Sequence, residues 1–209
     1  MILNTTTCIL IVTIASSFYA WHHDHIYKKW ILNPYQVKHY HQYWRFFTSG
    51  FVHINYLHLF FNMFALFFFG QNVAYYFGLQ GDLLMLALYL LGIIVSDIPT
   101  FIKYQDVPNY NSLGASGGVA AVVFSSIMFD PLNLLMIFPI PFGIPGFILG
   151  ALYLIYSYYQ GKRMADNINH DAHLYGALFG LIFTVVLRPA VVLNFIGEVT
   201  SWAQQLLGL

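Results

Sequence analysis

The sequence contains few charged residues. Only 8% of its 209 residues are Asp, Glu, Lys or Arg, whereas a soluble domain of average composition carries about a quarter. These charges are clustered, so long apolar runs lie between them. The composition excludes an ordinary soluble domain and predicts a polytopic membrane protein that folds as a single domain over residues 1–209. The net charge of zero gives no indication of a nucleic-acid partner.

Cysteine is also scarce. Cys8 is the one cysteine, so no disulfide can form within the chain. It lies in the first apolar run, where we expect it to pack as a small apolar residue. This run has neither the basic start nor the small-residue cleavage motif of a signal peptide. We therefore expect a retained helix.

Six apolar segments are candidates for crossing a bilayer, which requires about twenty helical residues. A long amphipathic segment, about 22–51, follows the first one, and its His, Tyr, Trp and Lys residues are typical of the membrane interface. Polar loops are expected at 103–112 and 160–167, and four prolines between 131 and 145 prevent a continuous helix there. The tail 190–209 is amphipathic and is expected to be cytoplasmic. The six predicted helices cover 3–21, 56–78, 83–101, 115–129, 146–159 and 171–187.

A serine stands between glycines at the start of the fourth predicted helix, in the motif GASG (114–117). The first turn of a helix has backbone N–H groups without intrahelical acceptors and a positive dipole end, both of which favour an anion. A histidine stands at the start of the sixth helix, in the motif AHLYG (172–176). Serine hydrolysis needs a nucleophile and a base within reach of it. The pattern predicts Ser116 as the nucleophile and His173 as the general base.

The second predicted helix supplies further polar groups. His58 and Asn62 are four residues apart and share a helical face, and His53 lies about one turn earlier. Side-chain donors on this face can reach an oxyanion above Ser116. Since no carboxylate has an obvious position for orienting His173, we predict a catalytic dyad.

Taken together, these motifs resemble the rhomboid intramembrane serine proteases, in their bacterial six-helix form. Trp-Arg at 44–45, the histidines and asparagine of 53–62, GASG and AHLYG follow the family's order and approximate spacing. The resemblance implies an all-α bundle of six transmembrane helices with an interfacial first loop, and cleavage of transmembrane segments without a cofactor or metal. The residues it assigns are Ser116 and His173 for catalysis, His58, Asn62 and Ser116 for the oxyanion hole, and Trp44, Arg45, His53, Gly114, Gly117 and Gly176 for structural support.

The resemblance also implies a multi-pass protein of the bacterial inner (cell) membrane. Its partners would be transmembrane protein substrates and membrane lipid, with helix five as a lateral gate. Both termini would be cytoplasmic. Of the eight Lys and Arg residues, only Arg188 would then lie on the cytoplasmic side, which is the opposite of what the positive-inside rule predicts. We keep the family orientation as an expectation.

Two positions depart from the family pattern. Some members carry an acidic residue towards the end of helix two, where this chain has QNVA (71–74). Some place an aromatic residue four positions after the serine, against the catalytic histidine, where this chain has Ala120. Tyr175 is a candidate for supporting the His173 ring instead.

Other interpretations compete with catalysis. Ser116 can be a small packing residue and His58 and Asn62 interhelical hydrogen-bonding groups, while His170, one turn from His173, is a rival base. The chain can then be a catalytically inactive rhomboid-like protein that binds membrane proteins, or a small transporter. Six helices without an internal repeat favour neither a transporter nor a channel.

Overall fold

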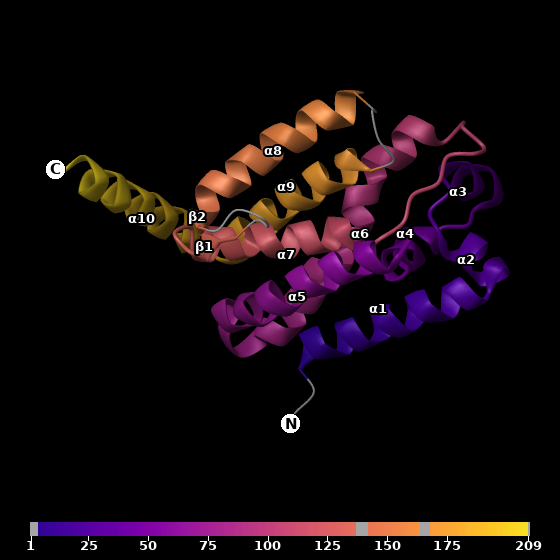
Figure 1. The fold of residues 1–209 in the computed structure, drawn as a ribbon, viewed down its shortest axis with the longest axis horizontal. Helices are drawn as coiled ribbons and strands as arrows, with labels where there is room; N and C mark the ends of the chain where they lie inside the picture. The colour runs from indigo at the N-terminus through magenta and orange to yellow at the C-terminus, as the bar shows by residue number, and fades with distance from the viewer. Residues whose placement is uncertain (1–3, 137–141, 164–167, 209) are drawn as a thin grey trace.

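The computed structural model describes residues 4–136, 142–163 and 168–208, which form a helical bundle (Figure 1). Six helices of the bundle correspond to the six predicted ones. Their bounds are α1 Thr5–His22, α5 Tyr56–Phe77, α6 Gly81–Tyr104, α7 Ser116–Phe129, α8 Gly146–Arg163 and α9 His170–Leu187. Successive helices of the six run in opposite directions, so α1 begins and α9 ends at the same end of the bundle (Figure 1).

Asparagine caps define where three of these helices begin. The side chains of Asn4, Asn55 and Asn169 each accept a hydrogen bond from the backbone N–H three residues further on, at 2.9, 2.8 and 3.0 Å. Such a cap satisfies one of the N–H groups that a helix leaves without an internal acceptor. Between α5 and α6, the short helix η2 (Gly78–Gln80) makes the turn, and Gly78 adopts a φ of 73° there.

The predicted interfacial segment forms a compact layer of short helices at the end of the bundle where α1 ends (Figure 1). These helices are α2 Asp24–Trp30, α3 Pro34–Tyr40, α4 Arg45–Thr48 and η1 Ser49–Phe51. Arg45 is buried and donates to the Gln42 side chain at 2.7 Å. It also donates to the carbonyls of Lys28 and Ile31, at 2.9 and 2.6 Å. One guanidinium therefore connects three parts of this layer.

Several boundaries differ from the sequence prediction. The predicted loop at 160–167 is wrong in its first part, because α8 continues to Arg163; Lys162 donates back to the Tyr158 hydroxyl one turn earlier. The chain is also not purely α-helical, since β1 Leu134–Leu135 pairs antiparallel with β2 Ile144–Pro145 between α7 and α8. The rest of that loop and two of the four prolines, within 164–167 and 137–141, lie outside the described residues.

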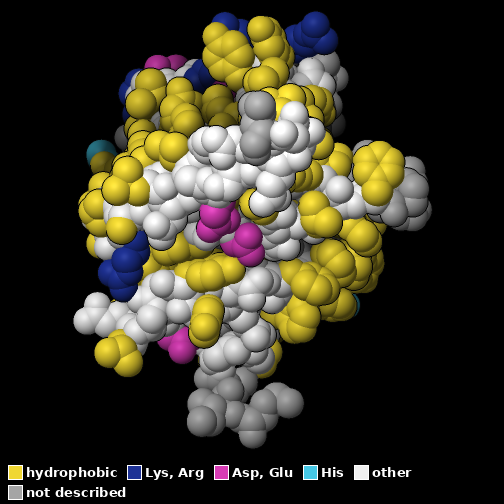
Figure 2. All heavy atoms as spheres, turned by 90° about the vertical axis from the view of Figure 1, so that its left-hand side faces the viewer, with side chains coloured by type: hydrophobic (Ala, Val, Ile, Leu, Met, Phe, Trp, Pro, Cys, Tyr) yellow, Lys and Arg dark blue, Asp and Glu magenta, His cyan; other side chains and the backbone are white. Residues whose placement is uncertain are grey.

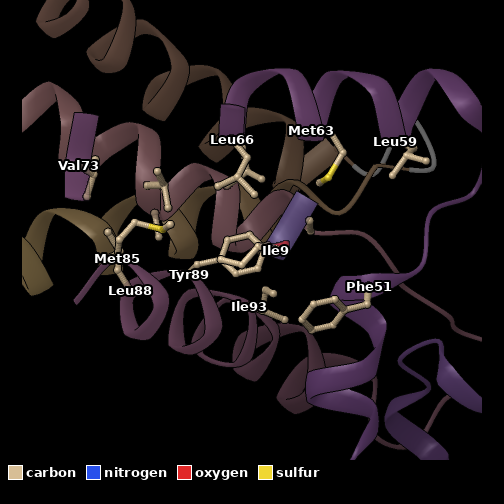
Figure 3. Close-up of a cluster of buried hydrophobic side chains, with 14 of the residues drawn as sticks. Ile9, Phe51, Leu59, Met63, Leu66, Val73, Met85, Leu88, Tyr89 and Ile93 are labelled. Atoms are coloured by element: carbon tan, nitrogen blue, oxygen red, sulfur yellow. The ribbon is translucent and has the colours of Figure 1, made fainter. Parts of the chain in front are cut away.

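The core lies where α1, α5, α6 and α7 meet (Figure 3). Close approach of the helices depends on small residues, as is usual in membrane bundles. A Cβ on Gly118 of α7 would lie 2.7 Å from the Tyr89 carbonyl oxygen of α6, and a Cβ on Gly180 of α9 would overlap the Ala121 carbonyl oxygen of α7. The main buried apolar side chains are Ile9, Leu59, Met63, Leu66, Val73, Phe77, Met85, Leu88, Tyr89, Ile93, Val119 and Val122.

Two described segments have the length and apolar character of membrane spans. Tyr56–Tyr104, which comprises α5 and α6, reaches a mean hydropathy of 2.0, and His170–Leu187 reaches 1.4; Ser116–Phe129 is apolar but shorter. Phenylalanines cover the outer face of α5. Phe60, Phe64 and Phe68, which are spaced four residues apart, are each about half exposed. Apolar side chains also cover much of the surface in Figure 2. The structure fits a membrane protein, and the number of six spans stays a prediction.

The predicted amphipathic tail forms a final helix, α10 Ala190–Leu207, which leads away from the bundle where α9 ends (Figure 1). Leu193, Ile196 and Leu206 are exposed along it. Trp202 contacts Phe147 at the start of α8, with ring centroids 5.4 Å apart. The helix therefore touches the bundle near the β1–β2 pair.

Candidate active site

A pocket of about 520 Å³ lies among α5, α7, α8 and α9. The four residues that the sequence suggested for catalysis and for the oxyanion hole, Ser116, His173, His58 and Asn62, all line it. Most of its other lining residues are apolar, including Phe61 from α5. The fold thus brings polar residues from three helices to one otherwise apolar cavity.

Ser116 is the first residue of α7, and the backbone just before it is held from two sides. The Gly114 N–H donates to the Ser49 carbonyl at 3.0 Å, and the Ala115 N–H donates to Nε2 of His53 at 3.3 Å. Gly114 has a φ of 118°, which a residue with a side chain rarely adopts. The Ser116 N–H consequently belongs to a fixed first turn, where helices bind anions.

His53 is fully buried in the loop before α5 and does not line the pocket. Burial, followed by repulsion from His58, lowers the pKa of His53 to about 3. The ring is therefore neutral, and because Nε2 accepts from Ala115, Nδ1 carries the proton. Nδ1 lies 3.0 Å from Ser17 Oγ, which in turn donates to the Phe51 carbonyl at 3.1 Å. His53 thus connects α1 to the backbone beside Ser116.

His58 and Asn62 reach the pocket from the first turns of α5. The His58 ring occupies the space that a side chain on residue 114 would fill, since a Cβ there would lie 2.5 Å from its Cε1 atom. Asn62 is buried and its Nδ2 donates to the His58 carbonyl at 2.9 Å. An amide nitrogen has two N–H groups, so this bond leaves one for a ligand.

The helices that carry Ser116 and His173 touch at their backbones. A Cβ on Gly176 would overlap the carbonyl oxygen of Gly117, and a Cβ on Gly117 would overlap Oγ of Ser96 on α6. Glycine at both positions allows this approach. Ser116 directly precedes one of these glycines, and His173 lies three residues, or about one turn, before the other.

Two rings pack against His173. The Tyr153 ring of α8 is nearly parallel to it, at 15° with centroids 6.3 Å apart, and the His170 ring meets it edge-on at 6.0 Å. His170 is 4% exposed, contacts Tyr156, and is not among the residues that line the pocket. Of the two histidines, His173 is the one placed with Ser116. Tyr175, considered from the sequence as the supporting ring, is 42% exposed.

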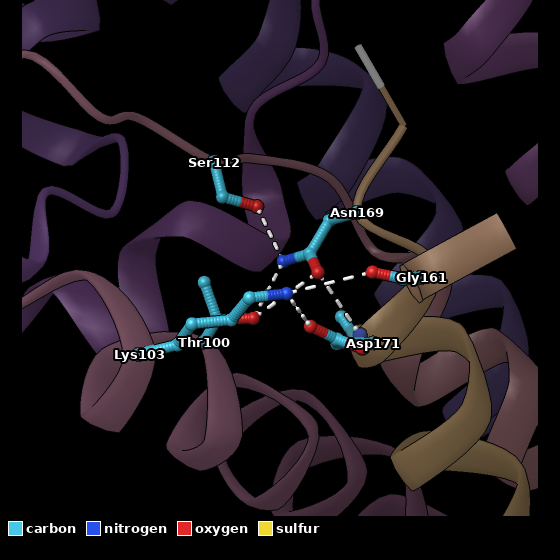
Figure 4. Close-up of polar contacts among 7 residues, drawn as sticks. Thr100, Lys103, Ser112, Gly161, Asn169 and Asp171 are labelled. Carbon is cyan, nitrogen blue, oxygen red and sulfur yellow. Dashed lines mark hydrogen bonds and ion pairs between the residues drawn. The ribbon is translucent and has the colours of Figure 1, made fainter. Parts of the chain in front are cut away.

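Asn169 joins the start of α9 to two other segments (Figure 4). Besides capping α9, its Nδ2 donates to the hydroxyls of Thr100 and Ser112, at 2.9 Å in both cases. Thr100 lies near the end of α6, and Ser112 lies in the loop that leads to Ser116. One amide therefore links the start of α9, the end of α6 and the loop that leads to Ser116, and the sequence analysis did not single it out.

A charged pair lies beside this amide (Figure 4). Lys103 of α6 contacts the Asp171 carboxylate at 3.0 Å and the Gly161 carbonyl of α8 at 3.5 Å. Asp171, the carboxylate nearest to His173 in the sequence, is thus engaged by a lysine. The pair connects α6, α8 and α9 at the end of the bundle where α7 and α9 begin.

Comparison with known proteins bears on this arrangement. The family model for the rhomboid domain matches residues 40–190. The chain belongs to the rhomboid family. It is 31% identical over 157 residues to RHOMBOID-like protein 12, mitochondrial, of Arabidopsis thaliana. That match covers 68% of this chain and 45% of the relative, so the chain spans less than half of the relative's length.

The matched rhomboid region begins before Trp44 and ends after Gly176, and so includes every candidate site residue. The predicted family is confirmed, and with it an integral membrane protein. The bacterial origin that the resemblance suggested has no support here, because the relative is described as mitochondrial. Trp44 itself, beside the buried Arg45, is 44% exposed.

Proposed function

We propose that this rhomboid-family protein is an intramembrane serine endopeptidase that cleaves transmembrane segments with a Ser116–His173 dyad. The observation that carries the proposal is the shared pocket: a serine at a helix start, a histidine and two further polar side chains line one mostly apolar cavity. Such a cavity suits a peptide segment that comes from lipid, and the polar groups suit acyl transfer.

The proposed reaction has two halves. His173 takes the proton from Ser116 Oγ, which attacks the scissile carbonyl carbon. The resulting oxyanion accepts hydrogen bonds from Asn62, His58 and the Ser116 N–H. When the C–N bond breaks, His173 gives its proton to the leaving amine, and an acyl-enzyme remains. Water then attacks the acyl carbon while His173 accepts a proton from it. The bond between the acyl carbon and Ser116 Oγ breaks as Oγ takes that proton from His173, which releases the acid product and restores the serine hydroxyl.

The route of entry follows from the walls of the pocket. On one side the wall is α8, which contributes Leu149, Gly150 and Tyr153. We propose that α8 forms the lateral gate through which a substrate helix enters, in the bundle of six spans that the family resemblance implies. A small side chain next to the scissile bond is expected.

The orientation in the membrane is part of this proposal. Seven of the eight Lys and Arg residues belong to α2, α3 and α4 or to the last turns of α6 and α8, which lie at the end of the bundle where α7 begins (Figure 1). Arg188 directly follows α9, at the other end. We keep both termini on the cytoplasmic side, although the positive-inside rule favours the reverse. A membrane-impermeant thiol reagent, applied to intact cells that express single-cysteine variants at Gln105 and Gly197, tests it. Labelling at Gln105 alone supports the family orientation, and labelling at Gly197 alone reverses it.

The competing function is a catalytically inactive rhomboid-like protein that binds other membrane proteins. The same pocket can hold a transmembrane helix without cutting it. The presence of both Ser116 and His173 in the pocket favours catalysis, because binding alone requires neither a nucleophile nor a base.

The test uses purified wild type, Ser116→Ala, His173→Ala and His170→Ala in detergent. Each is incubated with a single-span substrate that carries a helix-destabilised site of small residues, and with a fluorophosphonate that labels activated serines. We expect cleavage and labelling by wild type and His170→Ala, and neither by the other two variants. If His170→Ala loses activity while His173→Ala keeps it, the assigned base is wrong. If wild type neither cleaves nor labels, the inactive binding protein is the better account.

A further inference from the structure

The described ring that is nearly parallel to the His173 imidazole comes from α8, not from α7. The sequence has Ala120 at the α7 position where some family members place an aromatic residue. Tyr153 instead lies at 15° to the imidazole plane with centroids 6.3 Å apart, an offset stack. We propose that Tyr153 is the positioning residue for His173, which rests on the proposed function of the Ser116–His173 pair.

The local packing explains how Tyr153 reaches this place. Gly150, one turn earlier on the same face of α8, lets that helix approach α7 closely: a Cβ there would lie 3.1 Å from Ile127 and 3.4 Å from Phe124. The Phe124 ring lies 5.7 Å from the Tyr153 ring. Tyr153 also packs against the small buried cluster that contains Ala120. An alanine at 120 and a glycine at 150 thus make room for a ring from α8.

The other tyrosines of α8 lie elsewhere. Tyr156 packs edge-on against His170, at 5.5 Å. Tyr158 and Tyr159 contact each other and are 46% and 58% exposed. Of the four, Tyr153 is the one that both lines the pocket and faces His173.

A flat neighbour matters because of what the imidazole must do. General base catalysis requires one ring nitrogen to point at Ser116 Oγ, and rotation about the Cβ–Cγ bond of His173 removes it. A nearly parallel ring beside the imidazole opposes that rotation. Since Tyr153 belongs to the proposed gate helix, outward movement of α8 would also withdraw the ring from His173.

The test measures the second-order rate of Ser116 labelling by a small fluorophosphonate, which needs little of the substrate pocket, in folded protein. Tyr153→Ala is expected to label at least tenfold more slowly than wild type, because small errors in catalytic geometry cost about that much or more. Tyr153→Phe, which keeps the ring, is expected within threefold of wild type. Tyr159→Ala removes an exposed tyrosine of the same helix, serves as the matched control and is expected to label at the wild-type rate.

A double variant distinguishes ring packing from general damage. Ala120→Tyr in the Tyr153→Ala background supplies a ring from α7 where the α8 ring is missing, and at least threefold recovery over Tyr153→Ala is expected. With peptide substrate, kcat of Tyr153→Ala should fall more than KM rises. The midpoint of thermal unfolding is measured for every variant, so that only folded proteins are compared.

Three results would overturn the positioning role while leaving the proposed function intact. They are wild-type labelling by Tyr153→Ala, equal losses in Tyr153→Ala and Tyr153→Phe, and a folded double variant that is no faster than Tyr153→Ala. Absence of labelling in wild type itself would instead remove the proposed function.

Discussion

Gly176 of α9 lies against the carbonyl oxygen of Gly117 on α7, with no space for a Cβ between them. This contact joins the two helices that carry His173 and Ser116. The serine is adjacent to one glycine and the histidine is about one turn from the other, so the distance between the two helix backbones also determines whether the side chains can meet. The glycines are therefore part of the active-site geometry as well as of the packing.

Gly176→Ala is expected to push α7 and α9 apart. Overpacking of this kind costs about 1–3 kcal/mol of stability, and we expect Ser116 labelling by a fluorophosphonate to fall at least tenfold as the pair separates. Thermal unfolding and labelling rates measure the two effects. Gly197→Ala is the control, because a Cβ on Gly197 of α10 meets nothing within 4 Å. Wild-type labelling by Gly176→Ala would contradict the role given to this contact.

Asn169→Ala removes the cap of α9 together with the links to Thr100 and Ser112. The lost cap alone costs about 0.5–2 kcal/mol. Because the first turn of α9 carries His173, we also expect labelling of Ser116 to fall at least fivefold. Asn4→Ala is a matched control, since it removes the same kind of cap from α1 at the other end of the bundle. Equal effects of the two variants on labelling would show that Asn169 acts only through general stability.

The sequence was sufficient for the framework of the fold. Apolar runs and helix-start residues gave five of the six main helices to within about three residues. The end of α8 was misplaced, because a polar composition at 160–163 indicated a loop. There, Lys162 reaches back to Tyr158, and α6 contacts the Gly161 carbonyl through Lys103. The first contact lies within α8, whereas the second depends on the tertiary structure and leaves no local signal.

The sequence likewise predicted only some of the residues of the candidate site. Ser116 and His173 stand in short motifs with unusual residue types for a membrane helix, so the sequence marks them as candidates. Tyr153 is one of four tyrosines on α8, and nothing in its neighbourhood marks it until α8 is packed against α9. Likewise the sequence placed His53 near the site but did not reveal that its ring binds the Ala115 N–H.

Arg45→Lys is expected to loosen the interfacial layer. The guanidinium donates in several directions at once, to the Gln42 side chain and to two backbone carbonyls, and a lysine ammonium cannot reproduce that fork. Buried hydrogen bonds from a charged group contribute about 1.5–3 kcal/mol each, so we expect a loss of about 2 kcal/mol or more in thermal or denaturant unfolding. Arg163→Lys, at an exposed position of α8, should have no measurable effect. An unchanged stability of Arg45→Lys would show that one of the three bonds is sufficient.

The pH dependence of stability is expected to depend on His53. In the unfolded chain this histidine takes up a proton near its ordinary pKa of 6.5, whereas in the folded protein burial lowers the pKa to about 3. Between these values the unfolded state binds more protons than the folded state. The contribution of His53 to the free energy of unfolding is therefore complete above pH 6.5 and decreases as the pH falls towards 3. The slope is about 1.4 kcal/mol per pH unit for one such group.

The measurement is the free energy of unfolding in detergent between pH 7.5 and pH 5, for wild type, His53→Gln and His25→Gln. His53→Gln removes the titrating group, while its amide oxygen can still accept a hydrogen bond from the Ala115 N–H. The free energy of unfolding of this variant should therefore change less steeply with pH than that of wild type, by the slope of about 1.4 kcal/mol per pH unit that one proton gives. His25→Gln, at an exposed position of α2, is the control for exchanging a histidine for a glutamine. If wild type and His53→Gln instead lose stability in parallel, the His53 ring is protonated in the folded state, and it then cannot accept the hydrogen bond that holds the backbone beside Ser116.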